Sequence, residues 1–335
     1  MKNLRKNKIG YIYGIAILLL LLSAVLGVLL GASELSLSDM LSSLAKGDLE
    51  SPEARILIYV RLPRMLSTLI CGAALAVSGA VIQGVLANRL ASPSIIGVNA
   101  GAGLAVTVCS ALGIMGGWRL SLFAFGGAFL TVMLVSLGAK KWGASRGTVI
   151  LMGVALNALL GAISDTVTTF NPEVSIQSLD FKIGDFSSVT YAKLIPATVI
   201  VLVSILILLT LSNELDVLTL GDENAKGLGL NTGVMRVIFL LICALLAGAS
   251  VSVCGLLSFV GLLVPHAVRK IATSESKHLL PLCALFGAGF VSICDTIARV
   301  VFAPYELPVG IIMAFLGAPF FIFILIRGKG GHSRA

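Results

Sequence analysis

Nine apolar stretches make up most of the sequence and restrict the fold more than any other feature. About 20 consecutive apolar residues in a helix cross a bilayer core of about 30 Å. Because most of the stretches are close to that length or longer, the sequence predicts an all-α polytopic membrane protein. The stretches cover residues 9–32, 63–86, 95–116, 120–139, 148–169, 194–211, 237–268, 279–301 and 309–326.

The composition argues against the other classes of protein. Of the 335 residues, 57% are hydrophobic and only 12% are charged. A soluble domain carries about 25% charged residues. So few charges could not cover so apolar a chain in water. A soluble enzyme, a nucleic-acid-binding domain and a disordered chain are therefore disfavoured.

The seventh stretch, residues 237–268, is too long for one ordinary helix and too short for two. Gly248, Gly255 and Gly261 interrupt it, and Pro265 lies near its end. We predict a break near Gly255 that separates a full helix from a short one. The chain would then have ten spans.

The charges support ten spans. With the N-terminus inside, the inner segments hold 16 of the 24 basic residues and five of the 16 acidic ones, which is a net charge of +11 inside and −3 outside. Cytoplasmic loops are enriched in Lys and Arg. We therefore predict cytoplasmic termini and interpret the overall charge of +8 as a topology signal. A cleaved signal peptide ending near residues 31–33 is the alternative for the first stretch, whose apolar core of about 22 residues exceeds the usual length.

Two segments repeat each other at a constant offset of 176 residues, and they belong to the second and seventh predicted helices. Because these helices are five spans apart, they should run in opposite directions, as in the inverted repeats of transporters. Close packing by small residues would explain the same pattern. The matching pairs are Gly72 and Gly248, Ala73 and Ala249, Val77 and Val253, and Gly79 and Gly255.

The sequence contains no motif for an energy source or a catalytic centre. It has neither a GxxxxGK[ST] phosphate loop nor an HExxH zinc motif. His266, His278 and His332 are too scattered for a metal site, and the six cysteines lie in apolar runs where packing explains them. Few charges fall mid-span, which disfavours an ion-driven transporter and an intramembrane protease. We predict a transport subunit that is powered by a separate protein.

One inner loop is long enough to have a function of its own. It follows the sixth predicted span and reads SNELDVLTLGDENAKGLGLNT. Thr219 and Asp222 have the spacing of a capping box, and Gly227 and Gly229 are suitable helix stops. The loop therefore predicts a short helix from about Leu220 to Leu228. Because so short a helix is unstable alone, it must pack on the membrane domain or on a partner.

The sequence resembles the FecCD-type permease subunits of ABC importers for ferric siderophores, haem and cobalamin. The resemblance covers residues 10–326 and is carried by RLPR at 61–64, GAALAVSGAVIQGVLANRLASPSIIGVNAGAG at 72–103, LGDENAKGLGL at 220–230, GLLSFVGLLVPHAVR at 255–269 and ELPVGIIMAFLGAPFFIFIL at 306–325. It implies one permease domain over residues 1–335, with ten transmembrane helices in the bacterial plasma membrane. It also implies a cargo that is an iron chelate, with a ferric siderophore favoured over haem or cobalamin.

The resemblance further implies the partners. They are a second permease copy or close paralogue, an extracytoplasmic binding protein and two cytoplasmic ATPases, which carry the ATP and Mg. This chain would be no enzyme itself and would bind no cofactor, metal or nucleic acid. A secondary transporter that works alone is the alternative function, and it would not need the structured inner loop.

Two sets of residues acquire roles from the resemblance. Residues about 213–232 would form the coupling segment that contacts the ATPase, centred on Leu220, Gly221, Asp222, Glu223, Asn224, Ala225, Lys226, Gly227, Leu228 and Gly229. Arg61, Arg64 and Arg299 would face outward and dock the binding protein through its carboxylates. Anchoring of helix ends is the alternative explanation for these arginines.

The chain departs from the family pattern in the outer segment LDFKIGDF. Phe181 stands where members of the family often have a tryptophan, and the charged residues Lys182 and Asp185 flank Gly184. We assign no substrate contact to this segment.

Overall fold

The structure, a computed structural model, describes residues 2–31, 51–114, 116–141 and 145–329. Within these ranges the chain is helical and contains no strand. All ten predicted segments form helices: α1 Lys2–Leu29, α4 Leu62–Val85, α5 Val98–Ala111, α6 Gly117–Lys141, α7 Arg146–Phe170, α10 Tyr191–Thr210, α13 Thr232–Cys254, α14 Val260–Ile271, α15 Ser276–Val300 and α16 Val309–Lys329.

Shorter helices connect them. The described chain adds α3 Pro52–Ile56, the π-helical turn η1 Leu57–Arg61, the 3₁₀ turn η2 Pro93–Ile96, α8 Pro172–Gln177, α9 Leu179–Ile183, α11 Ser212–Thr219 and α12 Asp222–Gly227. Because α3, η1 and α4 follow one another without a gap, the second span begins before its predicted start at residue 63.

Seven of the described helices are long and apolar enough to cross a membrane. The all-α membrane fold is thus confirmed. α5 and α14 have only 14 and 12 residues. At 1.5 Å per residue they reach about 20 Å, which is less than the thickness of a bilayer core. Ten crossings therefore remain a prediction.

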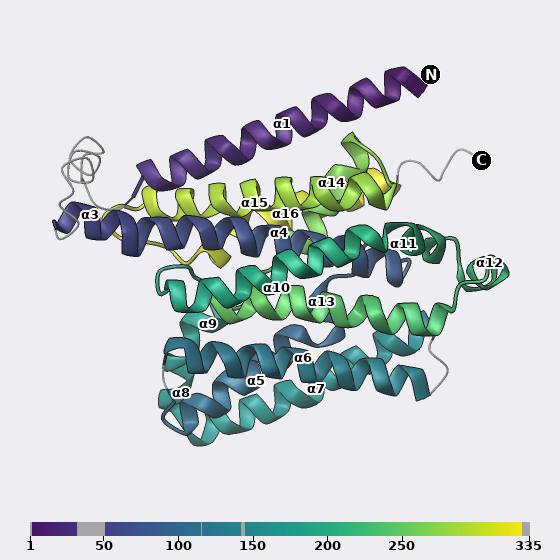
Figure 1. The fold of residues 1–335 in the computed structure, drawn as a ribbon. Helices are drawn as coiled ribbons and strands as arrows, with labels where there is room; N and C mark the ends of the chain where they lie inside the picture. The colour runs from purple at the N-terminus through teal and green to yellow at the C-terminus, as the bar shows by residue number, and fades with distance from the viewer. Residues whose placement is uncertain (1, 32–50, 115, 142–144, 330–335) are drawn as a thin grey trace.

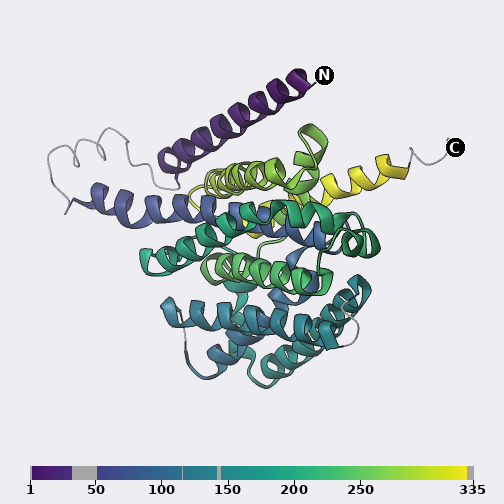
Figure 2. The same cartoon turned by 45° about the vertical axis from the view of Figure 1, so that its right-hand side comes forward.

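The ends of the helices define two ends of the bundle (Figure 1). The start of α1, the end of α16, α11 and α12 lie at one end, which we call the α12 end. The start of η1 and helices α3, α8 and α9 lie at the other, which we call the α8 end. An arrangement with both termini on one side requires an even number of passes, in agreement with ten. The turned view shows α1 at the edge of the bundle beside α15 (Figure 2).

The predicted antiparallel relation of the second and seventh spans is seen in the packing of α4 against α13. The Cys71 Sγ lies 3.8 Å from the Ser250 carbonyl oxygen, and the Cys243 Sγ lies 3.5 Å from that of Ser78. In these contacts the residue numbers rise along α4, from 71 to 78, and fall along α13, from 250 to 243. The two helices are therefore antiparallel neighbours.

The two halves also repeat their packing. Gly72 on α4 lets that helix approach α15, because a methyl group there would overlap the Gly287 carbonyl. Its counterpart Gly248 on α13 faces Phe125 and Ala128 of α6. In each half the long helix leads through an irregular segment into a short one, α5 or α14. These are the features of the predicted inverted repeat.

The predicted break near Gly255 is confirmed. α13 ends at Cys254, and Gly255 takes φ +72°, which favours glycine. The freed Leu256 N–H donates to the Phe181 carbonyl at 2.8 Å. α14 then begins at Val260. The prediction that the cysteines serve packing fits the structure, because all six are buried and unbridged.

Candidate functional site

The predicted short helix at the α12 end exists, but it is six residues long, from Asp222 to Gly227. It ends in a Schellman motif, in which the Leu230 N–H donates to the Ala225 carbonyl at 3.0 Å and the Gly229 N–H to the Lys226 carbonyl at 2.9 Å. Gly229 has φ +84° and is the helix stop that was predicted. Gly227 is instead the last helical residue.

The predicted capping box is wrong. Thr219 ends a separate helix, α11, and its hydroxyl donates to the Asp216 carbonyl at 2.7 Å. α12 begins after Gly221, which has φ +105° and offers no side-chain cap. The sequence predicts a loop over residues 212–219, where the structure has the helix α11.

Asp222 attaches α12 to the rest of the bundle. Its Oδ1 lies 2.8 Å from Arg236 Nη2 on α13 and 3.5 Å from Arg146 Nε at the start of α7. Arg146 also donates to the Leu218 carbonyl of α11 at 2.8 Å. Ala225, on the inner side of α12, is fully buried. The short helix is thus held by charge and by packing.

α11 is attached just as firmly. Leu215 and Leu218 are buried, and the Asp216 carboxylate accepts hydrogen bonds from the N–H and the hydroxyl of Ser276, at 3.0 and 2.6 Å. An acceptor at this position satisfies one of the free N–H groups at the start of α15. The segment therefore links α7, α13 and α15.

The outer side of the same segment is open to a partner. Glu223, Asn224, Lys226 and the chain through Gly229 are exposed. Leu220 and Leu228, on either side of α12, are 56% and 66% exposed. A firmly held projection with two exposed leucines and a charged middle can fit a recess on another protein.

At the α8 end the structure brings the three predicted docking arginines together but buries them. Arg61, Arg64 and Arg299 are only 4%, 5% and 3% exposed, so the side chains predicted to meet the binding protein lie within this chain rather than on its surface. Their donors instead serve groups within the chain. Docking of a partner by these arginines remains a prediction.

Two of these arginines cap the last turn of α1. Arg61 donates to the carbonyls of Val28 and Leu29 at 2.9 and 3.0 Å. Arg299 donates to the carbonyls of Gly27 and Leu30, both at 2.9 Å. The last carbonyls of a helix lack partners within it and attract cations. These contacts therefore fix the end of α1 against η1 and α15.

The third arginine lies in a buried ionic network. Arg64 binds the Asp295 carboxylate through Nε and Nη2 at 3.0–3.2 Å, and its Nη1 lies 2.6 Å from Glu306 Oε2. Arg299 Nε lies 3.0 Å from the other oxygen of Asp295. Asp295 is 1% exposed, whereas the Glu306 side chain is 34% exposed. Such a site tolerates buried charge only because each charge is paired.

Sequence reasoning missed both carboxylates as partners. The i,i+4 spacing of Asp295 and Arg299 was a detectable signal. The pairing with Arg64, 231 positions away, was not. Glu306 carried no signal either, because it follows the end of α15 in an irregular segment.

The segment LDFKIGDF, residues 179–186, holds neighbouring parts of the bundle through main-chain hydrogen bonds. The Phe181 carbonyl accepts from Leu256, the Asp185 N–H donates to the Cys254 carbonyl at 2.9 Å, and the Gly310 N–H donates to the Gly184 carbonyl at 3.2 Å. Lys182 is exposed. The contacts to α13, to the segment between α13 and α14, and to α16 are made by main chain. They depend little on which aromatic side chain occupies position 181.

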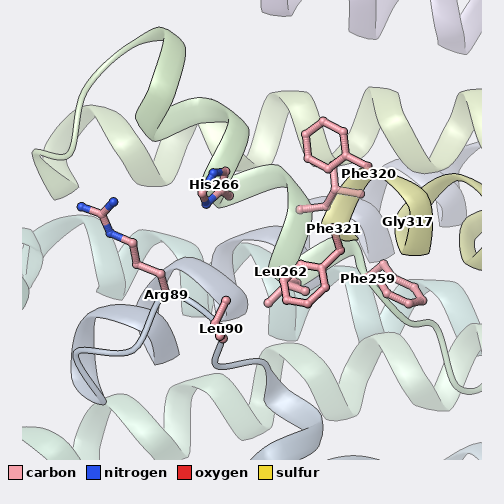
Figure 3. Close-up of a pocket in the computed structure, with 9 residues that line it drawn as sticks. Arg89, Leu90, Phe259, Leu262, His266, Gly317, Phe320 and Phe321 are labelled. Carbon is pink, nitrogen blue, oxygen red and sulfur yellow. The ribbon is translucent and has the colours of Figure 1, made fainter. Parts of the chain in front are cut away.

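A small apolar cavity lies between α14 and α16 (Figure 3). Phe259, Leu262, Phe320 and Phe321 line it, and its free volume is about 10 Å³, enough for about one water molecule. Phe259 packs against Gly317, where a methyl group would overlap its ring. We interpret this cavity as a small gap in the packing of α14 against α16 rather than as a binding site for a cargo.

The sequence is similar to those of known transport proteins. Residues 18–327 match the FecCD transport family. The chain is 37% identical over 315 residues to the Fe(3+)-citrate import system permease protein YfmD of Bacillus subtilis (strain 168), with 94% of each chain covered. It is 35% identical over 305 residues to the vitamin B12 import system permease protein BtuC of Yersinia enterocolitica, with 88% of this chain and 90% of the relative covered.

A solved structure has the same fold. It is described as an inward-facing conformation of a metal-chelate type ABC transporter, and it superimposes with a TM-score of 0.84 at 30% identity. The match covers 95% of this chain and 99% of the other.

Proposed function

Because the chain belongs to the FecCD transport family, we propose that it is the permease subunit of an ATP-driven importer for an iron chelate. Its relatives are permeases of import systems, and its helices are those of a multi-pass membrane protein. The relative named for Fe(3+)-citrate favours an iron complex as the cargo. Within this class we propose a ferric siderophore first, with haem and cobalamin as alternatives.

The observation that carries the proposal is the firmly anchored α11–α12 segment. A connector alone would not need a charge pair, a buried alanine and a Schellman stop to hold two exposed leucines in place. We assign to residues 220–229 the contact with a cytoplasmic ATPase. ATP and Mg would bind that partner, and this chain would bind no cofactor.

The orientation follows from the same assignment. The α12 end would face the cytoplasm, with both termini, and the α8 end would face the binding protein. Described basic residues at the α12 end include Arg89, Lys140, Arg146, Lys226, Arg236, Arg269 and Lys270, as expected for a cytoplasmic face of the plasma membrane.

A second permease copy would complete the pathway. In the apolar window of α7 only 17% of the residues are buried within the chain. The exposed residues of α7 include Asp165, whose charge is costly against lipid. We propose that α7 faces the second copy across a mostly apolar pathway that alternates its opening as the ATPases close.

Docking of the binding protein would use the α8 end. Arg64 is the arginine best placed for it, because its Nη1 already binds a partly exposed carboxylate, that of Glu306. A carboxylate of the partner could replace Glu306 there without unpairing Asp295.

The test is coupling in proteoliposomes that contain the permease, its ATPase and its binding protein. Gly229→Val forces a β-branched residue into φ +84° and should disrupt the end of α12 while leaving the bundle folded. We expect chelate-stimulated ATP hydrolysis to fall at least about tenfold, as for the loss of a few contacts at an interface centre. Gly103→Ala, at an open helical position of α5 outside the coupling segment, is the matched control and should retain activity. Full activity of Gly229→Val would remove α12 from the coupling role.

A further inference from the structure

A cavity of about 260 Å³ opens at the α12 end beside the base of the coupling segment. It lies where the end of α4, α11, α14 and the start of α15 meet. Its polar lining consists of Gln83, Arg89, Thr219, Arg269, Ser274 and Ser276. No carboxylate of the described residues lines it. The cavity is therefore cationic and rich in hydroxyl groups.

The two arginines of this cavity have no counter-ion within the described chain. Arg269 is half-buried and donates only to neutral oxygens, the Gln83 side-chain carbonyl and the Ala80 main-chain carbonyl, the latter at 3.3 Å. Arg89 is exposed and makes no hydrogen bond or ion pair with any described residue. Figure 3 shows its guanidinium extending away from the phenylalanine rings.

A neighbouring cation adds to the imbalance. Lys270 follows Arg269 on α14, is exposed, and is not paired with a carboxylate among the described residues. Two carboxylates lie next to lining residues: Glu275, between the two serines, is exposed, and Asp216 already accepts hydrogen bonds from the N–H and the hydroxyl of Ser276. Only Asp216 lies on α11 beside the cavity. It is thus committed to the start of α15.

Holding two arginines at this cavity costs free energy unless an anion is present. A partly buried charge without a counter-ion loses hydration that neutral oxygens only partly restore. Two guanidinium groups on one cavity also repel each other. A phosphate group would relieve both costs, because its oxygens match the planar donors of arginine and accept from hydroxyl groups.

We propose that this cavity binds a phosphate-bearing anion from the α12 side. The phosphate would belong to an anionic lipid headgroup or to a soluble phosphate. It would join α4 and α14 to α11, which carries the coupling segment. The proposal does not depend on the transport role, since it rests on binding by this chain alone.

The test is ligand-dependent stability of the purified full chain in neutral detergent. Its thermal midpoint is measured against inorganic phosphate, with sodium chloride at matched ionic strength as the salt control. A second series adds phosphatidylglycerol or phosphatidylcholine, and native mass spectrometry counts the bound lipid. We expect a saturable rise with phosphate or with phosphatidylglycerol, and none with chloride or phosphatidylcholine. A response to phosphate indicates a soluble anion, and a response only to phosphatidylglycerol indicates a lipid.

Substitutions test whether the rise in the thermal midpoint comes from binding at this cavity. Arg89→Gln, at an exposed position where folding should be unaffected, and Arg269→Gln should each weaken binding by about tenfold, the scale of one charge-assisted hydrogen bond. Arg269→Lys keeps the charge and should retain part of the affinity. Lys140→Gln removes an exposed cation at the same end, outside the cavity, and should change nothing. No saturable rise in the parent, or an equal rise in Arg89→Gln and Lys140→Gln, would overturn the proposal.

Discussion

Asp295 is the residue on which the α8 end depends most. Its carboxylate separates two buried guanidinium groups, those of Arg64 and Arg299, which would otherwise repel each other. Arg299 in turn holds the last carbonyls of α1. The arginines singled out from the sequence are thus first of all structural. The pair of Asp295 with Arg299 has a local i,i+4 spacing that the sequence shows, whereas the partners of Arg64 could not be predicted, because buried pairs between distant segments leave no local pattern.

A substitution at Glu306 separates docking from structure. Glu306→Gln removes the charge that pairs with Arg64 Nη1 and leaves a weaker, neutral acceptor, while Asp295 keeps the arginine buried and paired. If Arg64 docks the binding protein, affinity should rise by about fivefold, which corresponds to about 1 kcal/mol for a partly exposed pair. The affinity should also fall more steeply as the salt concentration rises. The measurement is binding of the binding protein to the reconstituted permease.

Glu173→Gln is the control for this experiment, because Glu173 is an exposed carboxylate of α8 at the same end. Equal affinities of the parent and Glu306→Gln would leave Arg64 with a structural role only.

At the scale of helices, the crossing of α4 and α14 leaves no room for a side chain at the point of contact. A methyl group at Gly79 would overlap the Gly261 carbonyl, so the two helices could not lie as close together with a side chain there. We expect Gly79→Ala to lower the free energy of unfolding by about 1–3 kcal/mol, the usual cost of overpacking. Thermal unfolding in detergent measures it.

Gly103→Ala, on α5 with open space around it, is the matched control and should be neutral or slightly stabilising. A loss of stability no larger for Gly79→Ala than for this control would show that the crossing can relax.

Local sequence signals predicted the long helices and failed at their connections. The break at Gly255 could be predicted because glycines interrupt a stretch of unusual length. α11 could not, because its stability comes from Leu215 and Leu218 packing on distant helices and from Asp216 bonding Ser276. Without α11, Thr219 was mistaken for a cap of α12.

At the scale of the whole molecule, topology can be tested with single cysteines, and the buried native cysteines should give little background. Ser188→Cys, in the exposed connector after α9, should react with an impermeant label from outside. Ser145→Cys, just before α7, should react only after the membrane is opened. The matching sites at Ser42 and Ser333 lie outside the described residues. Outside labelling at Ser145 and Ser333 would contradict a cytoplasmic α12 end.

The overall architecture was largely predictable because the bilayer imposes it. Apolar length, the Lys and Arg bias and the repeated glycines indicated a helical membrane protein of two inverted halves. The sites were less predictable. The short helix α12 was predicted to within about two residues, the usual uncertainty of helix ends, whereas the burial of the three arginines was not predicted.

The central claim, ATP-driven import through this permease, is tested most directly by uptake of radioactive iron into proteoliposomes. The vesicles contain the permease with its ATPase, ATP is enclosed on the α12 side, and the binding protein loaded with a ferric siderophore is added outside. We predict uptake that requires ATP and the ATPase. Gly229→Val should lower this uptake at least about tenfold, whereas Gly103→Ala should retain it. Uptake by the permease alone, driven by a sodium or proton gradient without ATP, would contradict the account and identify a secondary transporter.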